Sequence, residues 1–392
     1  MYINLLKNLN NMSLTTNRAN VRTNLKIDPQ KKIWSDADLT RYINEGQRWI
    51  LSDPAVNWEF GETIGYLIPV LDYQEYRTST DDLPENFFST KIRTLLKARA
   101  SNGTNINFSD WASYNNNVAT APSVISQYAN RFFLNAGFQT APVYTTLHNM
   151  DTYDGNGTWV GTNDATTVAT DATTYKAGSG SVSFAIDVSN STENKATLTN
   201  STLTSVDISS YDLNDGGIML WVYFTSGTDI KAIEVKFGSD SSNYYAVKNY
   251  QTVQGGKYAD GWNRIFIPTV NRQTTGTPDM SAVDYLQVNI VFDSGETDQA
   301  TCRLDNIQFV DKYIEYWFTQ QATDLSGDSD ESVIPSQYQY IYETYAEYKA
   351  LRIVPGMEQR ATMRLDEAKL YKNQMIEELM YNLPRSFEML PR

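Results

Sequence analysis

The feature that most constrains this fold is a block from Tyr144 to Asp311 whose residue pattern differs from that of both flanks. Within it, runs of Thr, Ser, Asn, Asp and Gly separate short apolar stretches, for example at 217–224 and 262–267. Short β-branched and aromatic runs between turn residues are typical of sandwiches and barrels. The block therefore predicts a self-contained β-sandwich inserted into a chain of another architecture.

The block also differs from its flanks in charge. It holds 17 Asp and 3 Glu against 6 Lys and 3 Arg, a net charge of −11, whereas the whole chain carries −14. Nonspecific phosphate binding depends on clustered Lys and Arg, so this balance argues against direct nucleic-acid binding. An assembled ring can still pass DNA through its channel as cargo. No apolar run approaches the length of about 20 residues that a membrane span needs, so we expect no membrane contact.

The flanks carry helical patterns. Ser35 is a suitable N-cap, and apolar or small residues then recur at helical spacing from Leu39 to Ile50. An earlier helix is expected at about 16–25. After the block, 336–353 and the stretch after Pro355-Gly356 predict a helical hairpin.

Strand patterns fill much of the rest. From Trp58 to Leu134 the pattern favours strands, and Tyr313–Phe318 is a further strand that we expect beside Arg131–Leu134, its neighbour if the block were removed. A guest domain requires chain ends that meet in this way. We therefore predict an α+β chain: a discontinuous helical host domain with a small strand region, residues 1–143 and 312–392, interrupted by an all-β jelly-roll sandwich at 144–311.

The flanks resemble the head-to-tail adaptor, or connector, proteins of tailed bacteriophages. The resemblance rests on the order of several motifs: Arg18-Ala-Asn-Val-Arg22, Trp34-Ser-Asp-Ala-Asp-Leu-Thr-Arg-Tyr-Ile-Asn44, Leu83-Pro84, Tyr313-Ile-Glu-Tyr-Trp-Phe318 and Tyr345-Ala-Glu-Tyr-Lys-Ala-Leu351. It implies a virion protein of the phage neck, made in the host cytoplasm, whose homo-oligomeric ring, a dodecamer in that family, joins the portal protein to a tail or second neck-ring protein. The inserted block departs from a minimal adaptor, and we expect it to project outward. The N-terminal stretch to Asn11 and the tail 383–392 are suited to ordering on a partner.

Candidate portal or subunit contacts follow from this resemblance. They are two arginines one helical turn apart and three tyrosines of one aromatic helix face: Arg18, Arg22, Tyr338, Tyr342 and Tyr345. The alternatives are two solvated arginines and tyrosines that pack in a core.

The block itself resembles carbohydrate-binding modules of the jelly-roll, galactose-binding-like kind. The similarity rests on Met150-Asp-Thr-Tyr-Asp154, Lys176-Ala-Gly-Ser-Gly-Ser-Val-Ser-Phe184, Leu220-Trp-Val-Tyr223, Gly261-Trp262 and Leu304-Asp-Asn-Ile-Gln-Phe309. It implies a structural Ca²⁺ held by Asp151 and Asp305 with carbonyls near Tyr175 or Lys176, because hard oxygen ligands suit calcium. The alternative is two solvated aspartates at strand ends.

The alternative function for the chain is attachment of the virion to a host or environmental polysaccharide. Sugar binding needs exposed aromatic rings beside hydrogen-bonding groups, and the best candidates are Tyr244, Tyr245 and Tyr250, with Asn243, Asn249 and Gln251 beside them. Trp221 and Trp262 fall inside apolar runs, so we expect them in the core.

Catalysis is not expected. The chain has one histidine, His148, and one cysteine, Cys302, and it shows no Gly-x-Ser-x-Gly elbow and no phosphate-binding loop. Two carboxylates suffice for a glycosidase, but a block with twenty acidic residues contains some pair by chance.

Overall fold

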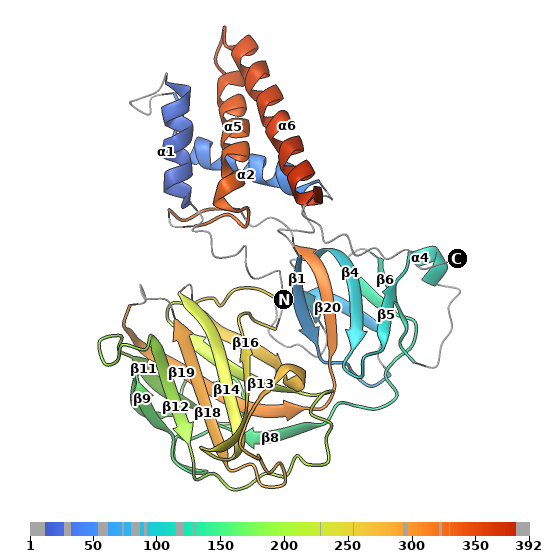
Figure 1. The fold of residues 1–392 in the computed structure, drawn as a ribbon, viewed down its shortest axis with the longest axis vertical. Helices are drawn as coiled ribbons and strands as arrows, with labels where there is room; N and C mark the ends of the chain where they lie inside the picture. Colours follow the sequence, from blue (N-terminus) through green and yellow to red (C-terminus); the bar gives the residue numbers. More distant parts are fainter. Residues whose placement is uncertain are drawn as a thin grey trace. The chain divides into compact units, whose positions relative to one another are not determined.

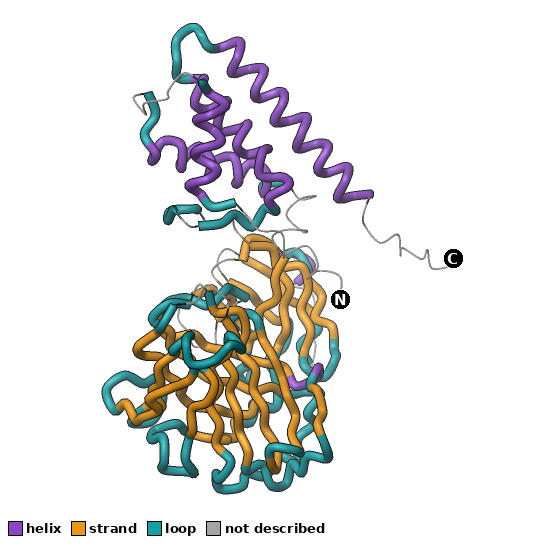
Figure 2. The backbone as a smooth tube through the Cα atoms, turned by 60° about the vertical axis from the view of Figure 1, so that its left-hand side comes forward, coloured by secondary structure: helices purple, strands orange, loops and turns teal. Residues whose placement is uncertain are grey.

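The structure is a computed structural model, and it describes residues 12–26, 33–53, 62–72, 74–79, 87–89, 92–114, 121–128, 131–227, 229–253, 255–292, 297–320, 324–328 and 330–381. They belong to two compact units, a helical unit (Met1–Thr63 with Thr319–Arg392) and a strand-rich unit (Ile64–Phe318). Figure 2 colours the backbone by secondary structure, and it shows that one unit consists mainly of helices and the other mainly of strands. The predicted α+β class is confirmed. The predicted docking segments, the stretch to Asn11 and the tail 383–392, lie outside the described residues, as does Leu83-Pro84.

In the part of the helical unit that the structure describes, the helices are α1 (Leu14–Leu25), α2 (Asp36–Leu51), α5 (Ser336–Arg352) and α6 (Glu358–Tyr381). Helix α2 begins as predicted: the Ser35 hydroxyl accepts a hydrogen bond from Asp38 N, and Asp38 accepts one from Ser35 N, which forms a capping box. Gly46 allows α2 to approach α5 closely, because a Cβ there would lie 2.9 Å from Tyr342 O. Helices α5 and α6 form the predicted hairpin (Figure 1).

The strand-rich unit contains an eight-stranded sheet of order β1-β20-β4-β5-β6-β7-β2-β3. Its strands are β1 (Glu62–Leu67), β2 (Glu75–Ser79), β3 (Phe87–Ser89), β4 (Ile92–Ala100), β5 (Asn105–Phe108), β6 (Val124–Tyr128), β7 (Arg131–Leu134) and β20 (Ile314–Gln320), with the short helix α4 (Trp111–Tyr114) after β5. The prediction that Tyr313–Phe318 lies beside Arg131–Leu134 is wrong. Strand β20 joins the same sheet, but it lies between β1 and β4. Two strands that become neighbours when the block is removed from the sequence therefore do not have to pair in the sheet.

The block forms a sandwich of two six-stranded sheets. The first has the order β10-β11-β19-β13-β16, with β8 paired to β19, and the second has the order β17-β15-β14-β18-β12-β9. The strands are β8 (Tyr144–His148), β9 (Val160–Asn163), β10 (Ala165–Asp171), β11 (Ser181–Ile186), β12 (Lys195–Asn200), β13 (Gly217–Phe224), β14 (Ile230–Asp240), β15 (Asn243–Asn249), β16 (Gly261–Pro268), β17 (Gln273–Thr275), β18 (Tyr285–Phe292) and β19 (Gln299–Val310).

The two ends of the block meet, as a guest domain requires. Tyr144 at the start of β8 pairs with Val310 at the end of β19. The next residues continue the contact, since Val143 N donates to the Asp311 carboxylate at 2.7 Å. The chain therefore enters and leaves the sandwich side by side.

The core of the sandwich lies between its two sheets and takes alternate residues of each strand. On β13 these are Ile218, Leu220, Val222 and Phe224, and on β18 they are Leu286, Val288 and Ile290. A separate apolar cluster joins the outer side of the first sheet to the neighbouring strand region; we call it the junction cluster, and it consists of Tyr66, Ile68, Met219, Val253, Phe266, Val310 and Tyr313. No helix within the described ranges is long and apolar enough to span a membrane.

Candidate functional site

The outward side of the second sheet of the sandwich is the main candidate site, and we call it the polar face. Because side chains alternate along a strand, the residues between the core positions point away from the core. On β14 these are Glu234 and Lys236, which lie between the core residues Ile233, Val235 and Phe237. The polar face consists of Asn163, Thr197, Glu234, Lys236, Tyr244, Lys248, Tyr250, Tyr285, Gln287 and Asn289.

Two of the three predicted sugar-stacking tyrosines lie on the polar face. Tyr244 is half-buried and carries the Lys236 ammonium 4.8 Å from its ring centroid, and Tyr250 is 58% exposed with Lys248 above its ring. Tyr250 follows the last residue of β15, so the two tyrosines lie at most about 20 Å apart along the chain. Tyr245 lies on the other side of β15, where it packs against Phe237 in the core. The three tyrosines therefore do not form one platform, since neighbours on a strand face opposite ways.

A chain of hydrogen bonds crosses the polar face between the strands. The Tyr285 hydroxyl donates to Gln287 at 2.6 Å, Gln287 donates to the Asn289 carbonyl oxygen at 2.7 Å, and Asn289 donates to the Glu234 carboxylate at 2.5 Å. Thr197 also donates to Asn289 at 2.9 Å. These side chains are fixed before any ligand arrives, which lowers the conformational entropy that binding costs.

The opposite sheet carries an aromatic outer side. Trp221 is only 6% exposed, as predicted for a buried residue, but it points away from the core between the sheets. Its ring is covered by Lys176 and Arg264, whose charged groups lie 4.8 and 5.0 Å from the ring centroid. Trp262 is half-buried on the same outer side, where it meets the Tyr223 ring edge to face at 5.6 Å. The prediction that both tryptophans belong to the core is therefore wrong about the side of the sheet.

The two predicted calcium ligands come close enough to interact. The Asp305 side chain is fully buried, and its Oδ2 accepts hydrogen bonds from Lys176 N at 2.6 Å and Ala177 N at 2.9 Å. Asp151 Oδ1 accepts one from Ser179 N at 2.6 Å. The loop therefore turns amide N–H groups toward the carboxylates, where the resemblance implied backbone carbonyls.

The electrostatics of this pair fit a cation. Asp305 Oδ1 is buried and has no hydrogen-bond partner among the described residues. Burial, with a smaller contribution from the negative charge of Asp151, raises the pKa of Asp305 to about 6. A carboxylate that is ionised at neutral pH, desolvated and unneutralised is costly, and a hard divalent cation would relieve that cost. No group of three or more His, Cys, Asp or Glu in the described part of the chain could hold a metal ion, so a calcium ion here would also need backbone or water oxygens.

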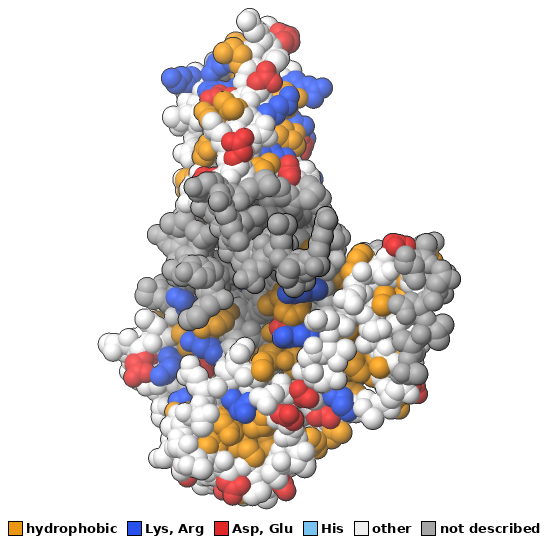
Figure 3. Space-filling model, turned by 45° about the vertical axis from the view of Figure 1, so that its right-hand side comes forward, with side chains coloured by type: hydrophobic (Ala, Val, Ile, Leu, Met, Phe, Trp, Pro, Cys, Tyr) orange, Lys and Arg blue, Asp and Glu red, His pale blue; other side chains and the backbone are white. Residues whose placement is uncertain are grey.

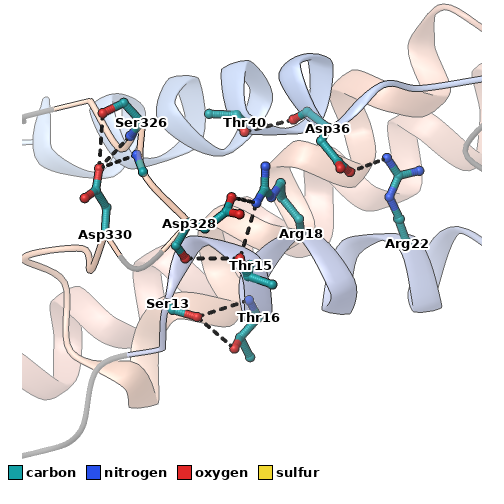
Figure 4. Close-up of polar contacts among 11 residues, drawn as sticks. Ser13, Thr15, Thr16, Arg18, Arg22, Asp36, Thr40, Ser326, Asp328 and Asp330 are labelled. Atoms are coloured by element: carbon teal, nitrogen blue, oxygen red, sulfur yellow. Dashed lines mark hydrogen bonds and ion pairs between the residues drawn. The ribbon is translucent and has the colours of Figure 1, made fainter. Parts of the chain in front are cut away.

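The two predicted contact arginines bind within the helical unit (Figure 4). Arg18 pairs with Asp328, and Arg22 donates at 2.9 Å both to Trp34 O and to the Asp36 carboxylate. The arginines thus tie α1 to the segments before α2 and before α5. Their role as contacts to a portal or a second subunit stays a prediction.

The three predicted contact tyrosines all lie on α5, but with different surroundings. Tyr342 is fully buried and Tyr338 nearly so, both in the helical core. Tyr345 is half-buried and stacks on Trp49 with the ring centroids 4.9 Å apart. Core packing therefore describes Tyr338 and Tyr342, and of these three tyrosines Tyr345 has the most surface left for a partner.

The single histidine is built into the sandwich. His148 is buried beside Trp159, its Nδ1 accepts a hydrogen bond from Met150 N at 2.9 Å, and its Nε2 lies 3.1 Å from Asn156 O. Burial lowers the pKa of His148. The ring is thus held neutral and engaged at both nitrogens, which suits a structural role.

The sequence reasoning did not find Glu234, Lys236, Gln287 and Asn289. A signal was available, because Ile233 to Phe237 and Leu286 to Ile290 alternate apolar and polar residues, and such alternation marks a strand with one side turned to solvent. What the sequence cannot supply is the register that places the two strands together, Lys236 opposite Gln287 and Glu234 opposite Asn289. Figure 3 shows Lys and Arg side chains beside hydrophobic ones on the strand-rich unit.

Comparison with known proteins gives only distant structural similarity. No protein-family model matches the chain, and no curated protein matches it. Among solved structures, a family 30 carbohydrate-binding module is 12% identical and has a TM-score of 0.31, with 43% of this chain and 98% of that chain covered. A family 11 carbohydrate-binding module from Clostridium thermocellum, in complex with a β-1,3-1,4-mixed-linked tetrasaccharide, is 14% identical with a TM-score of 0.28, covering 42% and 94%. At such scores these similarities carry no argument, and the sandwich is defined by its own strand order.

Proposed function

We propose that this protein binds a glycan chain along the polar face of its sandwich. The observation that carries the proposal is the pair Tyr244 and Tyr250, two accessible rings, one near the start of β15 and one just after its end, with a fixed hydrogen-bond network beside them. Each ring offers an apolar surface to a sugar ring, and Glu234, Lys236 and Gln287 offer hydrogen bonds to hydroxyl groups. A spacing of up to about 20 Å suits several consecutive sugar units.

The polar face suits a neutral chain better than a strongly charged one. It places Lys236 and Lys248 beside Glu234, so both signs of charge lie within one row of side chains. A polyanion would meet the Glu234 carboxylate, and a polycation would meet the two ammonium groups. Hydroxyl groups can use both kinds of partner.

The test is a glycan array on the full-length protein, followed by calorimetry with the best ligand. We expect Tyr244→Ala and Tyr250→Ala each to weaken binding about tenfold, which corresponds to about 1.4 kcal/mol. The matched control is Tyr340→Ala, which removes an exposed tyrosine from the helical unit and is expected to leave binding unchanged. A blank array, or equal losses in all three variants, would refute the proposal.

The adaptor function implied by the flanks stays a prediction, since no comparison supports it. A glycan-binding sandwich and a ring-forming helical unit are compatible in one chain. The mass of the purified protein, measured by light scattering with and without a portal ring, distinguishes an assembling chain from a monomer.

A further inference from the structure

The sandwich also contains a pocket of about 390 Å³ at the end of β8. It is lined by the end of that strand, by the turn 149–156 and by the segment 204–206. Six of its eleven lining residues have hydroxyl or amide side chains: Thr146, Asn149, Thr152, Asn156, Thr204 and Ser205. Leu147 and His148, both buried, line it as well.

The walls of this pocket are held by hydrogen bonds of their own. Asn156 accepts from Thr204 N at 2.8 Å through its side chain, and from the Asn200 amide at 2.9 Å through its backbone. Asn149 donates to the Asp151 carboxylate at 2.7 Å, and the same carboxylate is bound by Ser179 N. Both walls are therefore tied to neighbouring segments, and a ligand would enter a pocket that needs little ordering.

The charge of the pocket selects against anions. Asp151 is the one acidic residue among the lining residues, and His148 is kept neutral at pH 7 by the burial that lowers its pKa. In the metal-free protein, a carboxylated, sulfated or phosphorylated ligand would meet the Asp151 carboxylate without a cation among the lining residues to balance it.

The pocket differs from the polar face in one respect that determines how a sugar could bind. No phenylalanine, tyrosine or tryptophan is among its lining residues, and the one imidazole, of His148, is buried, so stacking against the middle of a chain is not available there. An open pocket lined by hydroxyl and amide groups instead suits a single hydroxyl-rich ring that enters end on.

We propose that this pocket binds one neutral sugar unit, either free or as the end of a glycan chain, as a site separate from the polar face. This inference deepens the proposed glycan-binding function. Binding of the end of a glycan chain in the pocket rests on that function. Binding of a free monosaccharide would stand without it.

The experiment is calorimetry of the full-length protein, in the presence of a chelator so that Asp151 carries no metal ion, with glucose, galactose, mannose, N-acetylglucosamine and glucuronic acid. Ser205→Leu puts a bulky apolar side chain on an exposed lining residue of the pocket, and Ser201→Leu is the matched control at a nearby exposed position outside the lining. We expect saturable heat with at least one neutral sugar and none with glucuronic acid. Ser205→Leu is expected to weaken that binding at least about tenfold, and Ser201→Leu and Tyr244→Ala are expected to leave it unchanged.

The outcomes separate the two proposals. Polysaccharide binding that is lost in Tyr244→Ala, together with no heat from any neutral monosaccharide, overturns the pocket and leaves the polar face standing. Monosaccharide binding that is lost in Ser205→Leu, with a blank polysaccharide array, supports the pocket and refutes the polar face. Equal loss in Ser205→Leu and Ser201→Leu, or stronger binding of glucuronic acid than of neutral sugars, also overturns the pocket.

Discussion

Asp305 keeps one carboxylate oxygen in a buried position that no hydrogen-bond donor of the described residues reaches. Its pKa is raised to about 6, above the value near 3.9 of an unfolded chain. The folded state therefore holds this proton more tightly than the unfolded state does. The resulting stabilisation is present at low pH and is lost as the pH rises through about 6.

The first prediction concerns the metal-free protein above that pH. In the presence of a chelator at pH 8, Asp305→Asn is expected to raise the free energy of unfolding by up to about 3 kcal/mol, since the amide keeps an acceptor for Lys176 N but carries no charge. At pH 4 the gain should vanish. Urea unfolding at both pH values measures the difference.

With calcium present at pH 8, the wild-type protein should gain stability and Asp305→Asn should not. Added Ca²⁺ is expected to raise the melting temperature of the wild-type protein at pH 8, to do so less at pH 5, and to leave Asp305→Asn unchanged. Asp154→Asn, which changes an exposed carboxylate near Asp151, is the matched control and should respond like the wild type. A wild-type melting temperature that ignores millimolar Ca²⁺ would remove the calcium hypothesis.

His148 gives a second prediction at the residue scale, with the opposite sign. Its burial lowers the pKa, so the unfolded chain binds a proton more readily, and native stability is lost as the pH falls below about 6.5. Nε2 faces both Asn156 O at 3.1 Å and the Trp159 Nε1–H at 3.2 Å, but because Nδ1 accepts from Met150 N at the shorter distance of 2.9 Å, the neutral ring should carry its proton on Nε2 and donate to Asn156 O. Nitrogen NMR of this single histidine should show that tautomer and a pKa below about 6.5, and a doubly protonated ring at pH 6.5 would contradict the structure.

At the scale of elements, strand β15 shows how alternation divides the tyrosines. Tyr244 and Tyr245 are neighbours in the sequence, yet one lies on the polar face and the other packs against Phe237 and Arg272. Tyr245→Ala is expected to destabilise the sandwich by about 2 kcal/mol, because it removes a partly buried ring that packs against the core. Tyr244→Ala should cost about 1 kcal/mol or less, since its ring is half-exposed.

Chemical denaturation measures the stability of the two variants, and calorimetry measures their affinity for the glycan. The expected pattern is crossed: Tyr245→Ala loses stability and keeps its ligand at low temperature, whereas Tyr244→Ala keeps stability and loses the ligand. If both variants lost stability equally, the register that pairs Phe237 with Tyr245 would be wrong.

The same alternation explains which elements could be predicted from the sequence. The helices were predictable because Ser35 with Asp38 and the stripe from Leu39 to Ile50 are local signals. Trp221 was misplaced because Leu220-Trp-Val-Tyr-Phe224 is apolar on both sides of the strand. The side of this strand that faces away from the core is apolar because other parts of the protein cover it. No local sequence pattern indicates that those parts lie there.

At the scale of the whole molecule, the change of residue pattern lies close to where β8 begins and β19 ends, whereas the grouping of the chain around the block has no such local signal. Tyr144 and Val310 pair where the change of residue pattern indicated. The strand region before and after the block, however, forms one compact unit with the sandwich and is separate from the helices. The reason is the junction cluster, whose members come from residues 66 to 313 and meet only through tertiary packing.

The junction cluster leads to the last prediction, which concerns where the chain can be cut. Met219, Phe266 and Val310 lie on the outer side of the first sheet and are buried there together with Tyr66, Ile68 and Tyr313. A fragment of residues 144–311 exposes those three side chains, and each is worth about 1.5–3 kcal/mol when buried. It should melt lower than a fragment of residues 64–318 and should bind a hydrophobic dye.

The double variant Met219→Thr with Phe266→Thr separates this cause from a general effect of truncation. In the fragment 144–311 these side chains have lost their partners, so the polar replacements should reduce dye binding at little cost in stability. In the fragment 64–318 they still fill the junction cluster, and the same replacements should lower the melting temperature. Opposite effects in the two fragments are expected only if the strand region and the sandwich share a core; a sandwich that merely projected from its host would respond to the two substitutions in the same way at either length.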